Sequence, residues 1–252
     1  MSIIKTFDPS KESILDPGHL AKRVDNFPER IICTFTGYML DTFMGHHTCD
    51  AIGKMSDGRK IYKTIYKGKP IAFFCGSIGA PATVIFLEEA IVKGASKILL
   101  FGSCGILDEG AIAGIADIII PTHAYRDEGT SYHYAPPEAG EFIEVKTSSR
   151  TAEIFKELNI PAVTGKVWTT DAIFRETRRN MELRKKAGCI IVDMECAGVM
   201  AMAGFRHIDV YQFMYAADNL DSDNWQKRKL GTLSTEEKKR YVEIALEVAL
   251  RI

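Results

Sequence analysis

The sequence of 252 residues predicts a single α/β domain built on a mostly parallel sheet. Short apolar runs of strand length alternate with longer stretches of helix length, which is the pattern of strand–helix–strand units. No change of composition, internal repeat or low-complexity segment divides residues 30–252, so we expect one domain there. Residues 1–29 are polar and interrupted by proline, and we expect an N-terminal arm on the surface.

In the first part of the chain, apolar and β-branched runs predict strands at 30–36, 60–66, 69–75 and 97–101. The pair Lys67-Gly68 indicates a tight turn between the second and third strands, and therefore a hairpin. The residues after Gly37 predict a helix to about residue 44, followed by a loop. A second helix, at 81–93, begins with a proline and is followed by Gly94, which suits a helix end.

The second part of the chain continues the alternation, with strands predicted at 116–120, 162–168, 189–192 and 210–216. Helices are predicted at 148–158, 178–186 and 235–250. Ser234 or Thr235 supplies the start of the last of these helices. The polar segment 125–140 has the Gly, Ser and Pro content that is typical of a functional loop.

Composition argues against several kinds of partner. The formal net charge of -1 gives no basis for binding nucleic acid or an acidic membrane surface. The longest apolar runs are about strand length, shorter than the roughly 20 residues of a membrane helix. The first residues have no long apolar core and no small-residue cleavage site, so we expect no signal peptide there. The six cysteines form no Cys-x-x-Cys pair, and four lie in or beside apolar runs, so we expect buried thiols in a cytoplasmic protein.

Two carboxylates, Asp193 and Glu195, follow the apolar run 189–192 and precede a stretch rich in Ala, Gly and Met. An ionised carboxylate in apolar surroundings is costly unless it accepts hydrogen bonds. At the C-terminal end of a buried strand a substrate can supply the donors. Alternatively, both carboxylates cap the following helix, where negative charge is favourable. The local sequence supports the two interpretations equally.

Two other strand ends carry candidate functional residues. The glycine-rich segment 102–105 (GSCG) would let backbone N–H groups approach an anion, or it is a structural tight turn. Asp218 stands where the strand at 210–216 opens into a polar loop. Partial desolvation there would raise its pKa and suit it as a general acid, and the alternative is an Asx-turn. The possible ligands at 46–50 lack the spacing of a zinc site, so we expect no metal.

Three motifs occur in order along the chain: FGSCGIL at 101–107, IVDMECAG at 191–198 and AADN at 216–219. WTTDAIFRET at 168–177 and DEGTSYHY at 127–134 accompany them. Through these motifs, the chain from about Arg30 to its end resembles the family 1 nucleoside phosphorylases. That family holds hexameric purine nucleoside phosphorylases, uridine phosphorylases and methylthioadenosine nucleosidases. The resemblance implies a three-layer α/β/α sandwich around a central mixed, mostly parallel twisted sheet, and a homo-oligomer, either dimer or hexamer.

The resemblance also implies a role for each matching residue. Glu195 would accept hydrogen bonds from the ribose hydroxyls, and Met194 would pack against the sugar. Such charge-assisted bonds are about twice as strong as neutral ones. Asp218 would be the catalytic residue that assists the departing base. The base pocket would be lined by Ile173, Phe174 and Arg179.

On the phosphate side, the resemblance implies binding by Ser103, Gly37 and Arg59, the last contributed by a neighbouring subunit. The sequence departs from the family here, because no arginine follows Gly37 and none precedes the GSCG segment. Arginine forks are the usual means of holding a phosphate dianion. The candidates to replace the missing side chains are Arg126, Arg175 and Arg23.

The sequence therefore predicts an enzyme that cleaves the N-glycosidic bond of a purine or uridine-type ribonucleoside with phosphate, giving the free base and ribose 1-phosphate. Phosphate would be the co-substrate, and no cofactor would be needed. One alternative is a nucleosidase that hydrolyses the same bond with water, as the missing arginines suggest. A second alternative is a non-catalytic protein that binds nucleosides.

Overall fold

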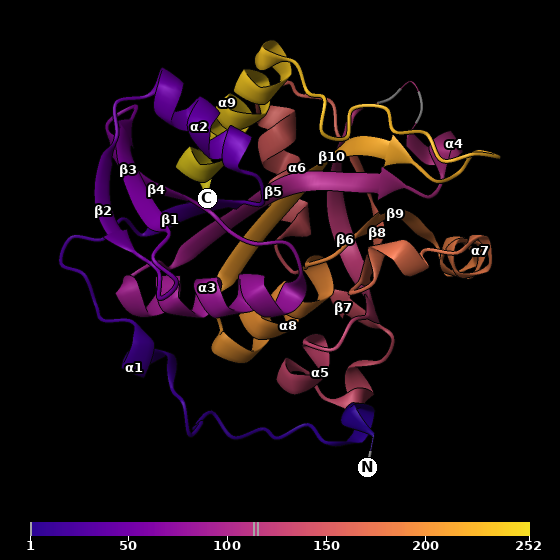
Figure 1. Ribbon diagram of the computed structural model, residues 1–252, viewed down its shortest axis with the longest axis horizontal. Coiled ribbons are helices and arrows are strands. Elements are labelled where there is room, and N and C mark those ends of the chain that lie inside the picture. The colour runs from indigo at the N-terminus through magenta and orange to yellow at the C-terminus, as the bar shows by residue number, and fades with distance from the viewer. Residues whose placement is uncertain (1, 113, 115) are drawn as a thin grey trace.

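The computed structural model describes residues 2–112, 114 and 116–252, which are built around a ten-stranded mixed sheet (Figure 1). The strands are β1 (Arg30–Thr34), β2 (Asp50–Lys54), β3 (Lys60–Tyr66), β4 (Lys69–Cys75), β5 (Lys97–Ile106), β6 (Ile118–Asp127), β7 (Phe142–Glu144), β8 (Val163–Thr170), β9 (Cys189–Asp193) and β10 (Asp209–Asn219). The longer helices are α2 (Gly37–His46), α3 (Ala80–Lys93), α6 (Ser148–Glu157), α7 (Arg178–Lys186), α8 (Cys196–Arg206) and α9 (Thr235–Arg251). Short helical turns are η1 (Ile3–Lys5), α1 (Pro17–Leu20), α4 (Glu109–Ile112), α5 (Ser131–Tyr134), η2 (Pro137–Ala139) and η3 (Ile173–Arg175).

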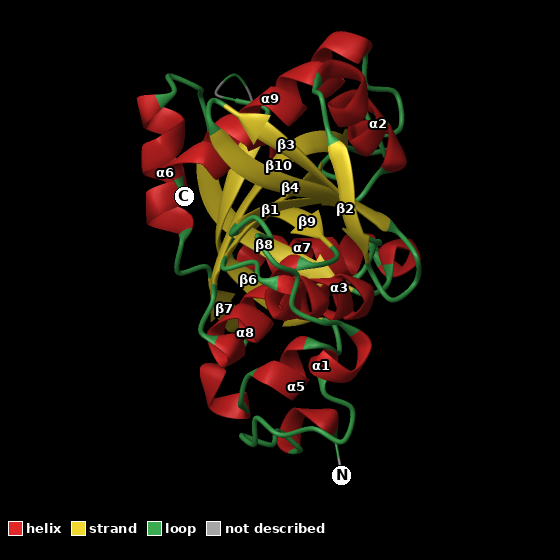
Figure 2. Cartoon of the chain, turned by 90° about the vertical axis from the view of Figure 1, so that its left-hand side faces the viewer, coloured by secondary structure: helices red, strands yellow, loops and turns green. Residues whose placement is uncertain are grey.

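Helices cover both faces of the sheet, with α2 and α9 on one side and α3 and α8 on the other (Figure 2). Successive side chains of a strand point to opposite faces, so a strand between two helix layers is apolar throughout. In β1, Ile31 packs with the α3 and α8 layer, and Ile32 packs with the α2 and α9 layer. Leu100 and Leu99 of β5 divide in the same way. The three-layer α/β/α sandwich expected from the sequence is therefore confirmed.

β5 joins two halves of the sheet. Along one edge it pairs with parallel β10 from Lys97 to Ile106. Along the other edge, β1 pairs in parallel with residues 97–101, and β9 pairs antiparallel with Gly105 and Ile106. Residues 102–104 thus lie between β1 and β9 without a strand neighbour on this edge in the described chain. The GSCG segment is therefore the continuation of a strand, not a tight turn.

Beyond β5, each half of the sheet has its own arrangement. On one side, β4 runs parallel to β1, and the antiparallel hairpin of β3 and β4, predicted at the same residues, leads to the edge strand β2. On the other side, β9, β8 and β6 are parallel, and β6 pairs antiparallel with β10, which closes a circuit back to β5. The residues of β2 lie where the sequence predicts a loop. Their side chains form no apolar run and are mostly exposed, so the local sequence does not indicate a strand there.

The N-terminal residues 2–29 run across the outside of the α3 and α5 region (Figure 1). α1 contacts α3, and η1 contacts α5, while most of the segment between them is exposed. The backbone N–H of Val24 donates to the carbonyl of Lys93 at 3.1 Å and fixes the end of this segment. Among the helices of the described residues, none has the length and apolar character needed to span a membrane.

Candidate active site

Polar side chains gather where β5, β9 and β10 end. Gly105 pairs with Val192 of β9 on one edge and with Asp218 of β10 on the other. A Cβ at Gly105 would lie 2.9 Å from Cγ1 of Val192 and 3.3 Å from Oδ1 of Asp218, so the approach of both strands requires glycine. Burial, followed by the charges of Asp193 and Asp218, raises the pKa of the Cys104 thiol. Carboxylates therefore flank the last residues of β5 on both sides.

Glu195 is 7% exposed and stands at the start of α8 without capping that helix. Its Oε1 accepts a hydrogen bond from the backbone N–H of Gly79 at 2.7 Å. Burial, followed by the negative charge of Asp193, raises the pKa of the Glu195 carboxyl. Because a carboxylate offers about four acceptor positions, the Gly79 bond leaves capacity for further donors from a ligand.

Asp193 has a different role, which the structure shows directly. Its Oδ1 accepts the Thr169 hydroxyl at 2.7 Å, and its Oδ2 accepts the backbone N–H of Cys196 at 2.8 Å. The N–H of Glu195 donates to the same Oδ2 at 3.3 Å. Asp193 thus caps α8, although burial raises its pKa. The capping interpretation applies to Asp193 and not to the Glu195 side chain.

Asp218 lines a cavity of about 560 Å³ between η3, the start of α7 and the loop after β10. The indole Nε1–H of Trp225 in that loop donates to its Oδ2 at 2.7 Å. Burial raises the pKa of Asp218, and the Trp225 hydrogen bond opposes this effect. Ile173 and Phe174 line the same cavity at its rim, where they are 47% and 95% exposed. The structure therefore brings these three predicted residues together.

Glu176 is a lining residue of the same cavity that the sequence did not single out. Burial, followed by the charge of Asp218, raises its pKa to about 7. Arg178 also lines the cavity, but its guanidinium donates to the carbonyls of Leu220 and Ser222 at 3.4 and 2.6 Å. Arg179, the arginine expected in the base pocket, is exposed on α7 and is not one of the residues lining the cavity.

On the far side of β5, the predicted phosphate ligands lie at the strand ends. Thr34 pairs with Phe101, so the chain two residues further along brings Thr36 and Gly37 to the same edge as Ser103. Ser103 is half-buried on β5, and Gly37 is the exposed first residue of α2. The Thr36 hydroxyl is buried and has no hydrogen-bond partner among the described residues. Sequence reasoning missed Thr36, because a threonine before a helix normally indicates a cap.

Arg59, expected to act across a subunit boundary, binds its own chain. Its guanidinium donates to the carbonyls of Cys75 and Gly76 at 2.7 and 2.5 Å and to the Ser77 hydroxyl at 2.8 Å. These residues lead to Gly79, the donor to Glu195. Arg59 therefore braces the loop that holds the carboxylate.

The arginines considered as replacements differ in their availability. Arg126 is buried and donates to the Ser131 hydroxyl and to the carbonyls of Ala135 and Pro136 at 3.0 to 3.1 Å. Arg23 and Arg175 are exposed. Of these three arginines, Arg126 is therefore held by its own chain.

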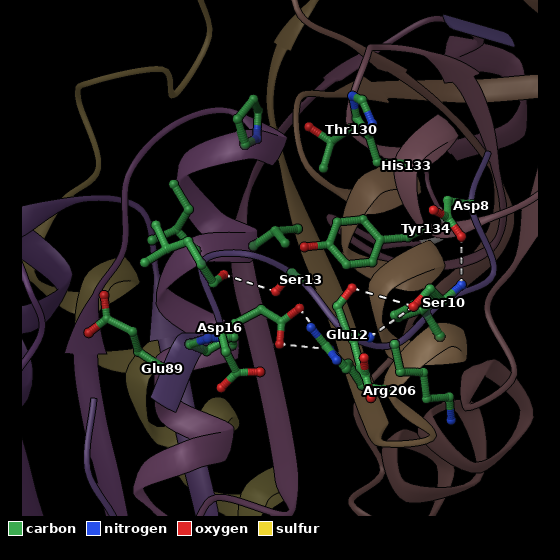
Figure 3. Close-up of a pocket in the computed structure, with 18 of the residues that line it drawn as sticks. Asp8, Ser10, Glu12, Ser13, Asp16, Glu89, Thr130, His133, Tyr134 and Arg206 are labelled. Atoms are coloured by element: carbon green, nitrogen blue, oxygen red, sulfur yellow. Dashed lines mark hydrogen bonds and ion pairs between the residues drawn. The ribbon is translucent and has the colours of Figure 1, made fainter. Parts of the chain in front are cut away.

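A second cavity, of about 690 Å³, lies between the N-terminal segment and the helices α3, α5 and α8 (Figure 3). Both Glu88 carboxylate oxygens accept Arg206 Nε–H at 2.9 Å on its wall. Neither Glu195 nor Asp218 lines it, so it is distinct from the strand-end site. Within residues 2–112, 114 and 116–252, no three His, Cys, Asp or Glu side chains are grouped so that they could hold a metal ion.

Known proteins resemble this chain along most of its length. A DeoD-type purine nucleoside phosphorylase of Aliivibrio salmonicida is 22% identical over 246 residues, 93% of this chain and 98% of its own. The crystal structure of a purine nucleoside phosphorylase from Toxoplasma gondii superposes with a TM-score of 0.74 at 21% identity, covering 90% of this chain and 93% of that one. A uridine phosphorylase structure from Vibrio fischeri gives 0.72 at 18% identity, covering 95% and 98%. Residues 30–252 match the family described as the phosphorylase superfamily, and the chain therefore belongs to this superfamily.

Proposed function

We propose that this protein is a nucleoside phosphorylase that cleaves the N-glycosidic bond of a ribonucleoside with phosphate, giving the free base and ribose 1-phosphate. The observation that carries the proposal is the pair of carboxylates, buried Glu195 and half-buried Asp218, on opposite edges of β5 at its glycine-rich end. Membership of the superfamily and the named relatives support the same activity.

The ribose would bind at Glu195. With one oxygen held by Gly79, the carboxylate accepts both neighbouring hydroxyls of the sugar as charge-assisted hydrogen bonds. Met194, half-buried beside it, would pack against the sugar ring. Binding replaces the lost solvation of a buried carboxylate, because the sugar supplies the hydrogen bonds that water would otherwise make.

The base would lie in the cavity of about 560 Å³ against Ile173 and Phe174, with Asp218 at its inner wall. A phosphate oxygen attacks the anomeric carbon while the carbon–nitrogen bond breaks, and the bonding electron pair leaves with the base. Asp218 offers a proton or a hydrogen bond to that base as negative charge develops on it. Its raised pKa favours the protonated form and so suits this role.

Phosphate would approach from the open edge of β5, where Ser103 and Gly37 provide a hydroxyl and the N-terminal backbone of α2. The unpartnered hydroxyl of Thr36 adds a third donor. Arg59 would come from a neighbouring subunit, as the resemblance implies. No cofactor takes part in this reaction, because phosphate is itself the nucleophile.

A homo-oligomer completes the proposal. Phe174 is 95% exposed at the mouth of the base cavity, and a neighbouring subunit would cover it. A dimer, or a hexamer made of three dimers, would do so. The six cysteines are free, which suits a cytoplasmic enzyme.

Hydrolysis of the same bond is the second candidate function, and one observation favours it. The first turns of α2 after Gly37 carry Asp41 and no arginine, and Leu99, Leu100 and Phe101 precede Ser103 on β5. A carboxylate repels a phosphate dianion. Base release from guanosine, inosine, adenosine and uridine, with and without phosphate, decides between the two. Release that does not depend on phosphate would overturn the phosphorylase proposal, and detection of ribose 1-phosphate would support it.

A further inference from the structure

We propose that Lys238 binds the phosphate co-substrate and supplies the positive charge that the missing arginines would otherwise provide. This inference rests on the proposed function, because it concerns the nucleophile end of the same site. Lys238 lies on the first turns of α9. It holds the phosphate dianion and takes no part in protonating the base.

The first turns of α9 lie at the edge of the sheet where the proposed phosphate ligands are. Shortly before α9, the backbone N–H groups of Lys229 and Leu230 donate to the carbonyl of Ala217, near the end of β10. At the other end of the helix, the carbonyl of Ile252 accepts Nε–H of Arg30, the first residue of β1. Because β1, β5 and β10 are parallel, α9 begins where these strands end (Figure 1).

Lys238 is also close to the start of α2, which lies beside α9 on this face of the sheet (Figure 2). Its Nζ is 5.2 Å from the ring centroid of Tyr38, the residue that follows Gly37. The hydroxyls of Tyr38 and Tyr215 are hydrogen-bonded at 3.2 Å, and Tyr215 pairs with Ser103 in the sheet. Tyr38 therefore connects the ammonium group with the strand residue proposed for phosphate.

The ammonium group of Lys238 is available to an anion. It forms no ion pair with the described residues, whereas two neighbouring cations do. Lys229 pairs with Asp117 at 3.3 Å and with Glu237 at 2.8 Å, and Arg240 pairs with the same Asp117 at 3.1 Å. Glu237, the acidic neighbour of Lys238 in the sequence, is thus already matched. The contact of Lys238 with an aromatic ring is weak beside a charge-assisted bond to phosphate, and its flexible stem lets Nζ turn to one.

Asp41 on α2 is the carboxylate that would oppose phosphate, and it is directed to another strand. Burial raises the pKa of the Cys75 thiol at the end of β4, and the charge of Asp41 adds to this effect. β4 and β5 lie on opposite edges of β1, and β10 lies beyond β5. Asp41 therefore acts toward β4, while Lys238 lies toward β10 through Tyr38. Ser103 on β5 is on the side of the lysine.

The donors at this edge complement a phosphate dianion. A lysine ammonium is a compact charge with three N–H donors, and lysine is a common ligand of phosphate in proteins. The buried Thr36 hydroxyl has no hydrogen-bond partner among the described residues, and it stands at the start of α2, whose N-terminus favours negative charge. Lys238 adds the full positive charge that these neutral donors lack.

The test compares the KM for phosphate and the KM for the best-cleaved nucleoside in the wild type and three variants. Lys238→Met keeps the stem and removes the charge, and Lys238→Arg keeps the charge. Lys239→Met removes the charge of the next residue on α9, whose side chain is exposed. We expect Lys238→Met to raise the KM for phosphate about 10- to 100-fold with little change in the KM for the nucleoside. Lys238→Arg and Lys239→Met should remain close to the wild type.

An unchanged KM for phosphate in Lys238→Met would overturn the inference. So would an equal rise in Lys239→Met, or an equal rise in the KM for the nucleoside. Should base release not depend on phosphate, the proposed function fails, and calorimetric titration with inorganic phosphate still tests Lys238 alone. Binding that is weakened in Lys238→Met and kept in Lys239→Met would support the inference. Equal binding by the two variants, or no binding by the wild type, would refute it.

Discussion

Replacing Glu195 with glutamine should make the protein more stable and the enzyme worse. The Glu195 carboxyl is buried beside Asp193, and its pKa is raised in the folded state. The folded protein therefore holds a proton that the unfolded chain releases above its ordinary pKa of 4.5. The free energy of unfolding consequently falls as pH rises from that value toward the raised one. Glutamine does not titrate, so Glu195→Gln should not lose stability in this way as the pH rises.

The expected difference in the free energy of unfolding follows from the shift of the Glu195 pKa. Each unit by which burial raises it destabilises the fold by about 1.4 kcal/mol once the group is ionised. For a chain of this length, that corresponds to a difference in Tm of about 3–6 °C. In the substrate complex, the variant exchanges a charge-assisted acceptor for a neutral one. This change costs about 1.5–3 kcal/mol for one hydroxyl, or about 10- to 150-fold in kcat/KM.

Thermal unfolding from pH 5 to pH 8, together with steady-state kinetics, measures both effects. We expect the Tm advantage of Glu195→Gln over the wild type to be small at pH 5 and to grow toward pH 8. Asp193→Asn is the matched control, because this neighbouring carboxylate accepts from Thr169 and Cys196. An amide nitrogen cannot accept the Cys196 bond, so the control should lose about 1–3 kcal/mol of stability.

Two results would refute this reasoning. A lower Tm for Glu195→Gln at every pH would mean that the carboxylate supports the fold, as a cap does. Unchanged kcat/KM would remove Glu195 from ribose binding. A further check uses 2′-deoxynucleosides, for which the variant should show a smaller penalty, because one of the two hydroxyls is already missing.

Asp218→Asn should lower kcat by about 10²- to 10⁴-fold, while the nucleoside affinity measured by titration should change little. Near-normal turnover in this variant would exclude Asp218 as the acid. Trp225→Phe removes the donor that lowers the pKa of Asp218, so the alkaline limb of the kcat profile should move to higher pH. An unmoved limb would separate Trp225 from the chemistry. Thr36→Val should raise the KM for phosphate about 10-fold without lowering Tm, because its hydroxyl has no partner in the described protein, and an unchanged KM would exclude it as a ligand.

Much of the fold could be predicted because local patterns determine it. The hairpin at 60–66 and 69–75 and the helix at 178–186 have the same bounds in the structure as in the prediction. The predicted end of this strand, at residue 101, was wrong, because glycines at 102 and 105 are typical of a turn. The pairing with β10 shows that the chain continues as a strand to Ile106. A local sequence pattern does not show which distant segments of the chain pair with one another.

The candidate site divides in a similar way. The sequence picked out Glu195 and Asp218, yet it could not say which of Asp193 and Glu195 caps α8, because the hydrogen bonds that decide come from distant residues. Glu176 was missed because it follows an exposed turn and gains its burial from the loop after β10. Such a side chain carries no signal until the tertiary structure places it.

The strand β5 has a further consequence for how this enzyme can change. β1 and β9 pair with it at separate places. The groups proposed for phosphate lie on β5 itself and in the segment that leads from the end of β1 into α2, while those for the base come from η3 and β10. Residues 102–104 are the short stretch at which the two assemblies meet. A change of nucleophile and a change of base are therefore independent problems for evolution or for a designer, and variants made on one side should combine additively with variants made on the other.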